Sequence, residues 1–205
     1  MSAGGNGACA APIVGILALQ GGFEAHAKIL TQLGATPREV RTAADLEGLD
    51  ALILPGGEST VMSLGIEREN LAGPLRELIG QGTPVLGTCA GMIILDREHL
   101  GLLNAVAQRN AFGRQLRSFE AEIEIPGVDG GPIRAVFIRA PWIAERGRDV
   151  EVLAEVDGHP VAVRQGNLLA LAFHPELAGE TRLHQLLLEQ VAARALTTRR
   201  SARAG

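Results

Sequence analysis

The stretch "VLGTCAGMIIL", residues 85–95, places one cysteine between two glycines, with apolar runs on both sides. An apolar strand followed by Gly-x-Cys-x-Gly and then a helix is the thiol form of a nucleophile elbow, in which a tight turn projects the side chain from the sheet. The start of a helix favours a thiolate, and the neighbouring N–H groups can stabilise an oxyanion. Taken alone, however, a buried cysteine is more often a small hydrophobe. The interpretation of Cys89 therefore depends on the rest of the sequence.

The elbow belongs to a series of apolar strands that alternate with helices. Continuous apolar runs indicate strands buried on both faces at residues 13–19, 51–54 and 84–87. Apolar residues at helical spacing predict helices over residues 23–34 and 71–82. This alternation predicts an α/β fold, a three-layer, flavodoxin-like, mostly parallel sheet with helices on both faces.

The second half of the chain has the pattern of an antiparallel section. Alternating apolar and polar residues, with glycine-rich or "DGHP" turns between segments, predict strands joined by hairpins at residues 119–125, 133–138, 150–156 and 161–164. Residues 167–173 return to the buried type of strand. A closing amphipathic helix is expected from about Glu180 to Ala195.

Length and composition indicate one globular domain. The chain has 205 residues, of which 46% are hydrophobic and 20% charged, which is enough for one well-buried core. We expect a disordered N-terminal tail at residues 1–12, a single domain at residues 13–196 and a disordered C-terminal tail at residues 197–205. Both end segments lack the apolar periodicity of a buried element.

Charge, aromatic content and cysteine usage exclude several classes of function. A net charge of -4, an aromatic content of 3% and the absence of tyrosine argue against a nucleic-acid partner. The apolar run at residues 13–19 is too short to span a membrane and lacks the flanks of a signal peptide. Cys9 and Cys89 are expected to be free thiols of a reducing, cytoplasmic compartment. The sequence has no metal-ligand spacing and no phosphate-binding loop, so we expect neither a metal nor a cofactor.

Four junctions follow the ends of the predicted buried strands, where ligands bind in open α/β sheets. They are "LQGG" (19–22), "LPGGEST" (54–60), "LGTCAG" (86–91) and "FHPE" (173–176). In the last junction, His174 and Glu176 are two residues apart, so both side chains point to the same side of an extended segment. A histidine there can take a proton from Cys89, and a carboxylate can orient that histidine. The chain order of cysteine, histidine and glutamate differs from that of an α/β-hydrolase, whose acid precedes its histidine.

Together, these segments resemble class I, triad-type glutamine amidotransferases, and most closely the family of glutaminase subunits of two-component pyridoxal 5'-phosphate synthases. The resemblance covers roughly Ile13 to Val191, through "GILALQGGFEAH", "LILPGGEST", "GTCAGMIIL", "RNAFGRQ", "SFEAEI", "FIRAP" and "FHPEL". The elbow and "HPE" are shared by the superfamily, whereas "PGGEST", "RNAFGRQ" and "FIRAP" single out this family. One departure is the short connection between Glu98 and Leu102, where many relatives carry a longer loop.

The resemblance implies that glutamine is hydrolysed to glutamate and ammonia through a cysteine thioester. Cys89 is then the nucleophile, His174 the general base and acid, and Glu176 the group that orients His174. The substrate-binding residues that the resemblance implies are Gly56, Gly57, Glu58, Arg109, Ile138 and Arg139. The implied oxyanion region comprises Gln20, Gly21, Gly57 and Ala90.

The resemblance also implies a partner for the ammonia. That partner is a (β/α)₈-barrel synthase subunit, held with this chain in a large hetero-oligomer, which makes pyridoxal 5'-phosphate from ribose 5-phosphate and glyceraldehyde 3-phosphate.

Three alternatives remain open. The chain could feed another acceptor, as in imidazole glycerol phosphate synthase, although "PGGEST" and "FIRAP" argue against this. It could be a stress-response or chaperone-like protein with an elbow cysteine, in which "HPE" would have no role. A catalytically inactive binding subunit is disfavoured by the complete set of Cys89, His174 and Glu176.

Overall fold

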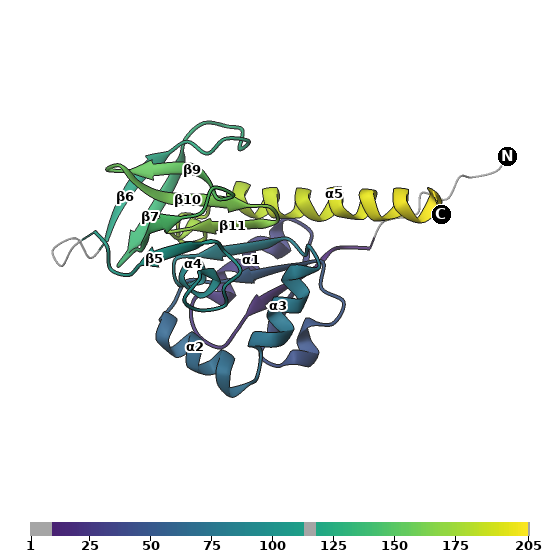
Figure 1. Cartoon of the computed structure of the whole chain (residues 1–205). Helices are drawn as coiled ribbons and strands as arrows, with labels where there is room; N and C mark the ends of the chain where they lie inside the picture. Colours follow the sequence, from purple (N-terminus) through teal and green to yellow (C-terminus); the bar gives the residue numbers. More distant parts are fainter. Residues whose placement is uncertain (1–9, 113–117, 205) are drawn as a thin grey trace.

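A seven-stranded sheet forms the centre of the computed structural model, which describes residues 10–112 and 118–204 (Figure 1). The strands lie in the order β2-β1-β3-β4-β11-β10-β9. Their bounds are β1 (Ile13–Leu17), β2 (Thr36–Val40), β3 (Ala51–Leu54), β4 (Val85–Thr88), β9 (Glu151–Val156), β10 (His159–Gln165) and β11 (Leu168–Leu171).

The five strands from β2 to β11 are parallel, and β10 and β9 extend the sheet in the antiparallel sense. The order of the parallel strands is that of a flavodoxin-like fold, so the predicted fold class is confirmed. Strands β3, β4 and β11 are buried along their whole length. Because neighbouring parallel strands end at the same edge, the junctions after β1, β3, β4 and β11 lie along one edge of the sheet.

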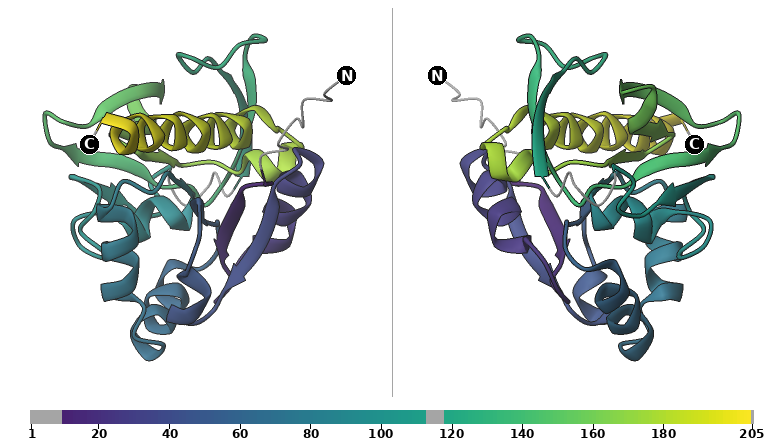
Figure 2. Two further views of the ribbon diagram at one scale, coloured as in Figure 1. Left: turned by 90° about the vertical axis from the view of Figure 1, so that its right-hand side faces the viewer. Right: turned by 90° about the vertical axis from the view of Figure 1, so that its left-hand side faces the viewer.

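Helices cover both faces of the sheet (Figure 2). The helix α1 (Phe23–Gln32) connects β1 to β2, whereas α2 (Ser59–Arg68) and α3 (Ala72–Gly80) connect β3 to β4 in the opposite direction across the sheet. Right-handed crossovers therefore place α1 and the α2–α3 pair on opposite faces.

The remaining helices extend these two layers. The helix α5 (Arg182–Ala204) lies beside α1, because His184 of α5 and His26 of α1 are hydrogen-bonded at 2.8 Å. The helix α4 (Ala90–Leu95) packs against α2. Two short 3₁₀ helices, η1 and η2, span Ala43–Leu46 and Pro175–Ala178.

Two antiparallel ribbons accompany the main sheet. They pair β5 (Ala105–Gln108) with β8 (Trp142–Arg146) and β6 (Ser118–Ile123) with β7 (Ile133–Ile138). Phe137 of β7 stacks on Phe119 with ring centroids 4.5 Å apart and lies 5.5 Å from the Phe173 ring, just beyond β11. This aromatic packing fixes the end of β7 beside the central sheet. The predicted antiparallel section is confirmed.

The strand β2 is one of three strands, with β5 and β8, that the sequence pattern does not predict. Its sequence, "TPREV", carries a proline and charged side chains, which are typical of sheet edges and not of buried strands. The strand does lie at the edge of the sheet, where it pairs with β1 alone.

The last helix is longer than the sequence pattern predicts. The apolar periodicity predicts an end near Ala195 and a disordered tail at residues 197–205, whereas α5 continues to Ala204. The prediction of a disordered tail is therefore wrong for residues 197–204, which are helical. The reason is that residues 195–204 contain no glycine or proline to stop a helix and include alanine and arginine, which are good helix formers.

Three parts of the chain lie outside the described residues. They are residues 1–9, most of the expected N-terminal tail, residues 113–117, which contain the end of "RNAFGRQ", and residue 205. None of the helices that the structure describes is both long and apolar enough to cross a membrane.

Gly91 tests the close packing of α4 against β3. A Cβ at Gly91 would collide with the Leu54 carbonyl oxygen, whereas a Cβ at Gly73 in α3 meets no atom within 4 Å. Gly91→Ala should lower the free energy of unfolding by about 1–3 kcal/mol through overpacking. Gly73→Ala should leave it unchanged or raise it by up to about 1 kcal/mol. Urea unfolding followed by circular dichroism measures both values, and equal stabilities of the two variants would contradict this packing argument.

Candidate active site

Cys89 occupies the turn between β4 and α4 in a backbone conformation that L-residues rarely adopt. Its φ is 46° and its ψ is -102°, and such strain persists only where surrounding contacts fix it. The Cys89 N–H donates to the Leu171 carbonyl of β11 at 2.7 Å. On the other side, the first turn of α4 approaches β3 so closely that a side chain at Gly91 would strike Leu54. The predicted elbow is present, with its thiol at the edge of the sheet.

His174 and Glu176 follow β11 and form a buried pair. His174 Nδ1 lies 2.7 Å from Glu176 Oε1, and the His174 N–H donates to the Val136 carbonyl of β7 at 2.9 Å. Burial lowers the pKa of His174, but its contacts with the Cys89 thiol group and the Glu176 carboxylate outweigh burial and raise the pKa to about 10. Burial raises the pKa of Glu176, and the hydrogen bond to His174 outweighs it, so that this pKa is lowered. The histidine is therefore held as an imidazolium between the Glu176 carboxylate and the Cys89 thiol group.

The segments that follow β1 and β3 pack directly against each other. The Gly22 N–H donates to the Gly56 carbonyl at 3.0 Å, and the Gln20 side-chain oxygen accepts from the Glu58 N–H at 2.6 Å. Gly21 has a φ of 103°, and a Cβ there would collide with the Gly56 carbonyl. The predicted oxyanion residues Gln20 and Gly21 thus support the glycine turn after β3.

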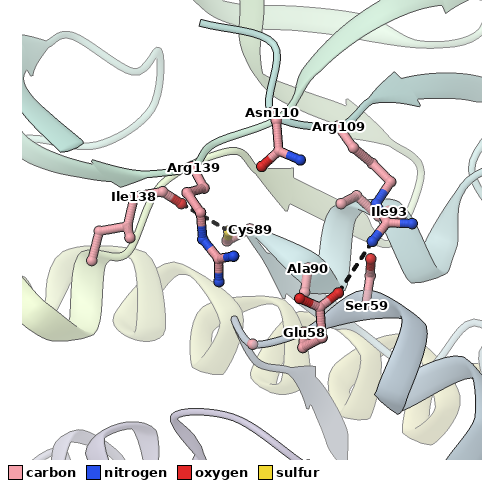
Figure 3. A pocket seen from close by; sticks show the side chains of 10 residues that line it. Glu58, Ser59, Cys89, Ala90, Ile93, Arg109, Asn110, Ile138 and Arg139 are labelled. Atoms are coloured by element: carbon pink, nitrogen blue, oxygen red, sulfur yellow. Dashed lines mark hydrogen bonds and ion pairs between the residues drawn. The ribbon is translucent and has the colours of Figure 1, made fainter. Parts of the chain in front are cut away.

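A pocket opens beside Cys89 (Figure 3). Its lining residues are Gly57, Glu58, Ser59, Cys89, Ala90, Ile93, Arg109, Asn110, Ile138 and Arg139. All but Ser59, Ile93 and Asn110 are among the site residues predicted from the sequence. Five other predicted residues do not line the pocket, and they affect it only through the residues that they contact. They are Gln20, Gly21, Gly56, His174 and Glu176.

The pocket carries charged groups on two sides (Figure 3). Arg109 donates to Glu58 Oε1 at 3.1 Å and to the Thr60 hydroxyl at 3.0 Å. The Ile138 carbonyl lies 3.9 Å from the Cys89 sulfur, and Arg139 follows it with a φ of 45°. A cation beside a carboxylate, with a backbone carbonyl opposite, suits a ligand that carries both an ammonium and a carboxylate group.

Three lining residues were not predicted from the sequence, although each had a local signal. Ser59 belongs to "PGGEST", and Ile93 lies one helical turn after Cys89. Asn110 follows Arg109 in "RNAFG" and adopts a φ of 48°, a conformation that asparagine tolerates better than most residues. In the part of the chain that the structure describes, no three His, Cys, Asp or Glu side chains are arranged to hold a metal ion.

A cysteine elbow at the carboxyl edge of a flavodoxin-like sheet, with a His-x-Glu pair after the neighbouring strand, defines the class I glutamine amidotransferases. Residues 16–193 match the SNO glutamine amidotransferase family, and the chain belongs to this family. The predicted family and fold class are confirmed.

Relatives with curated names are about half identical to this chain. The pyridoxal 5'-phosphate synthase subunit PdxT of Frankia alni is 52% identical over 189 residues, which are 88% of this chain and 95% of the relative. The protein of the same name from Mycolicibacterium vanbaalenii is 50% identical over 190 residues, which are 87% of this chain and 97% of the relative. A crystal structure described as a glutamine amidotransferase has a TM-score of 0.82 and 45% identity, covering 87% of this chain and 98% of its own.

Gly56 tests whether the glycine turn sets the position of His174. A Cβ at Gly56 would collide with the imidazole ring, whereas a Cβ at Gly22 meets its nearest atom, Glu176 Oε1, at an ordinary 3.7 Å. Gly56→Ala should displace the ring and lower kcat for glutamine hydrolysis about 100-fold. Gly22→Ala should retain almost full activity. Glutamate release by the two folded variants, each supplied with the synthase partner, measures the difference, and an active Gly56→Ala protein would show that the ring tolerates the added methyl group.

The titration of His174 tests its contact with the thiol group. The imidazole should stay protonated until the pH approaches about 10, and Cys89→Ala should lower this pKa. Because the folded-state pKa exceeds the ordinary 6.5, the interaction stabilises the fold fully below about pH 6.5 and is lost as the pH rises through about 10. NMR titration of the histidine Cε1–H signals measures the pKa in both proteins. An identical pKa in the two proteins would rule out the proposed contact.

Proposed function

We propose that this chain is a cytoplasmic glutaminase subunit that hydrolyses glutamine and supplies ammonia for the synthesis of pyridoxal 5'-phosphate. Membership of the SNO glutamine amidotransferase family supports the glutaminase activity. The relatives named pyridoxal 5'-phosphate synthase subunit, at 50–52% identity over most of both chains, support the acceptor. These relatives favour a pyridoxal 5'-phosphate synthase as the ammonia acceptor over an imidazole glycerol phosphate synthase.

The observation that carries the proposal is the strained elbow beside the pocket. In the first step, the thiolate of Cys89 attacks the side-chain carbonyl carbon of glutamine, and the oxygen becomes an oxyanion. The Ala90 N–H at the start of α4, together with an N–H of the Gly57 turn, stabilises this charge. His174 gives its proton to the departing nitrogen, which leaves as ammonia, and a γ-glutamyl thioester remains on Cys89.

Water completes the reaction. His174, now neutral, takes a proton from the water that attacks the thioester carbon, and the thiolate leaves as glutamate forms. The His174 imidazolium is restored, so the proton balance closes over one cycle. Glu176 holds the ring through Nδ1 at 2.7 Å and stabilises the imidazolium without changing its own protonation state.

Residues around the pocket hold the amino-acid end of glutamine. Arg109 binds the substrate carboxylate, and Glu58 accepts from the ammonium group, so that the substrate inserts into their existing ion pair. The Ile138 carbonyl adds an acceptor beside the sulfur, and Arg139 adds a second cation at the pocket wall. Both charges of the ligand are then matched, which selects an amino acid over a simple amide.

The ammonia acceptor is a separate (β/α)₈-barrel synthase subunit within a large hetero-oligomer. The relatives named as one subunit of a pyridoxal 5'-phosphate synthase support an acceptor on another chain. In this structure the Gly56 carbonyl accepts from the Gly22 N–H. A glycine turn can reorient at low cost, so docking of the synthase near residues 20–26 can complete the oxyanion site.

Glutamate release by the chain with and without its synthase tests this proposal. The isolated chain should be nearly inactive, and saturating synthase should raise the rate at least about tenfold, or roughly 1.4 kcal/mol of barrier. Cys89→Ala should abolish hydrolysis in both cases, whereas Cys9→Ala, whose site lies outside the described residues, should remain active.

The electrophilic glutamine analogue diazo-oxo-norleucine supplies the control. It should add once, at Cys89, as mass spectrometry of the digested protein can show. Labelling at Cys9, or turnover by the Cys89→Ala protein, would remove the nucleophile assignment. Full activity of the isolated chain would exclude activation by the partner but leave the chemistry of the site intact.

A further inference from the structure

A chain of buried histidines continues behind Glu176, on the side away from His174. His26 of α1 and His184 of α5 are both fully buried. His26 Nε2 lies 3.5 Å from Glu176 Oε2 and 3.3 Å from the Thr88 hydroxyl, and His26 Nδ1 lies 2.8 Å from His184 Nε2. The mechanism described above uses neither of these two histidines.

The second oxygen of Glu176 lacks a hydrogen bond in the described part of the chain. Oε1 is bonded to His174, whereas Oε2 is buried without such a partner. A buried carboxylate oxygen without a donor carries a large free-energy cost. The nearest ring nitrogen to Oε2 on this side is His26 Nε2, and a long contact of this kind can shorten when the substrate is bound.

The unpaired oxygen of Glu176 favours one of two tautomer arrangements of the two histidines. Both are neutral near pH 7, because burial lowers the pKa of His26 and lowers that of His184 to about 3. If His184 carries its proton on Nε2, it donates to His26 Nδ1, and the proton of His26 then lies on Nε2 and faces Glu176. In the reverse arrangement His26 Nε2 accepts from the Thr88 hydroxyl at 3.3 Å and turns its lone pair toward the carboxylate, so Oε2 of Glu176 has no donor. His184 Nδ1 lacks a hydrogen bond within the described residues, but the Glu180 backbone acts as an acceptor toward this ring, so His184 Nδ1 does not decide between the two arrangements.

We propose that His26 is a positioning residue of the active site. Its Nε2–H holds Oε2 of Glu176, while Oε1 orients His174, and His184 fixes the tautomer of His26. The inference rests on the proposed function, since it adds a member to the same site. A Glu176 held at both oxygens cannot rotate away from His174, and it stays ionised within a buried environment.

A structural role in the packing of α1 against α5 predicts different behaviour. The titratable groups that face His26 are Glu176, His174 and His184, and Glu180 lies near enough to act on His184. If His26 stabilises the Glu176 carboxylate, its loss raises the pKa of Glu176. As the pH falls, Glu176 is then protonated at a higher pH than in the wild type, and the His174 imidazolium loses its anionic partner there. A residue that only fills space would change stability without moving the pH dependence of Cys89 reactivity.

Two amide variants of similar polarity separate these roles. In His26→Gln the side-chain N–H can reach the place of Nε2, whereas in His26→Asn it reaches only that of Nδ1. The rate of Cys89 alkylation by iodoacetamide is measured against pH by mass spectrometry on the full chain. The kcat and KM for glutamine are measured with the synthase partner.

His26→Asn should move the acid limb of the alkylation profile to higher pH by about one pH unit. It should also lower kcat at least about tenfold with little change in KM. His26→Gln should keep the wild-type profile and most of the activity. If His26→Asn does not fold, as judged by circular dichroism, His184→Leu supplies the comparison and should shift the profile in the same direction by less.

Two results would overturn the proposal. One concerns the acid limb of the alkylation profile. The proposal fails if this limb stays at the wild-type position in both His26→Asn and His184→Leu, and it fails if the limb moves equally in His26→Asn and His26→Gln. The other is an ¹⁵N NMR spectrum of the wild-type chain that places the His26 proton on Nδ1. Neither the alkylation profile nor the spectrum depends on glutamine. A wild-type chain without glutaminase activity, but with the expected shifts, would refute the proposed function and leave the placement of His26 intact.

Discussion

The hydrogen bond from the Cys89 N–H to the Leu171 carbonyl joins the elbow cysteine to the strand that leads to His174. Because β11 pairs with β4, the segment that follows β11 places His174 beside the elbow. There the backbone N–H of His174 donates to the carbonyl of Val136 in β7. The end of β7 supplies the Ile138 carbonyl at the wall of the pocket. A single register between two parallel strands therefore aligns the thiol, the imidazole and the wall of the pocket, and a slip of that register would separate all three.

Sequence patterns predict the elements that are buried on both faces better than those at the margins. The bounds of β3 agree with the apolar run at residues 51–54, and β11 lies within the apolar run at residues 167–173, because burial leaves a clear mark on composition. The edge strand β2 carries proline and charge, and the end of α5 has no apolar face, so neither can be recognised by periodicity. The site was predictable where the residues sit in short motifs. The contact of His26 with His184 was not, because it joins helices from opposite ends of the chain.

Glu176 illustrates how the fold keeps a carboxylate ionised away from water. Its own burial favours the neutral acid, and the hydrogen bond to His174 together with the nearby His26 opposes that tendency. The histidines on its two sides differ in charge: His174 is held as a cation by a pKa raised to about 10, whereas burial lowers the pKa of His26 and keeps it neutral. The site thus concentrates one positive charge beside the thiol without a second cation that would compete for the carboxylate.

The position of β11 within the sheet has a consequence for biosynthesis. Val85 of β4 pairs with Leu168 of β11, so one side of β4 has no neighbouring strand until the last part of the chain has left the ribosome. A parallel pairing between such distant segments forms slowly, and an open central strand is prone to pair with other chains. The emerging polypeptide thus carries Cys89 beside an uncovered strand edge, and it gains both His174 and the missing strand in the same late event.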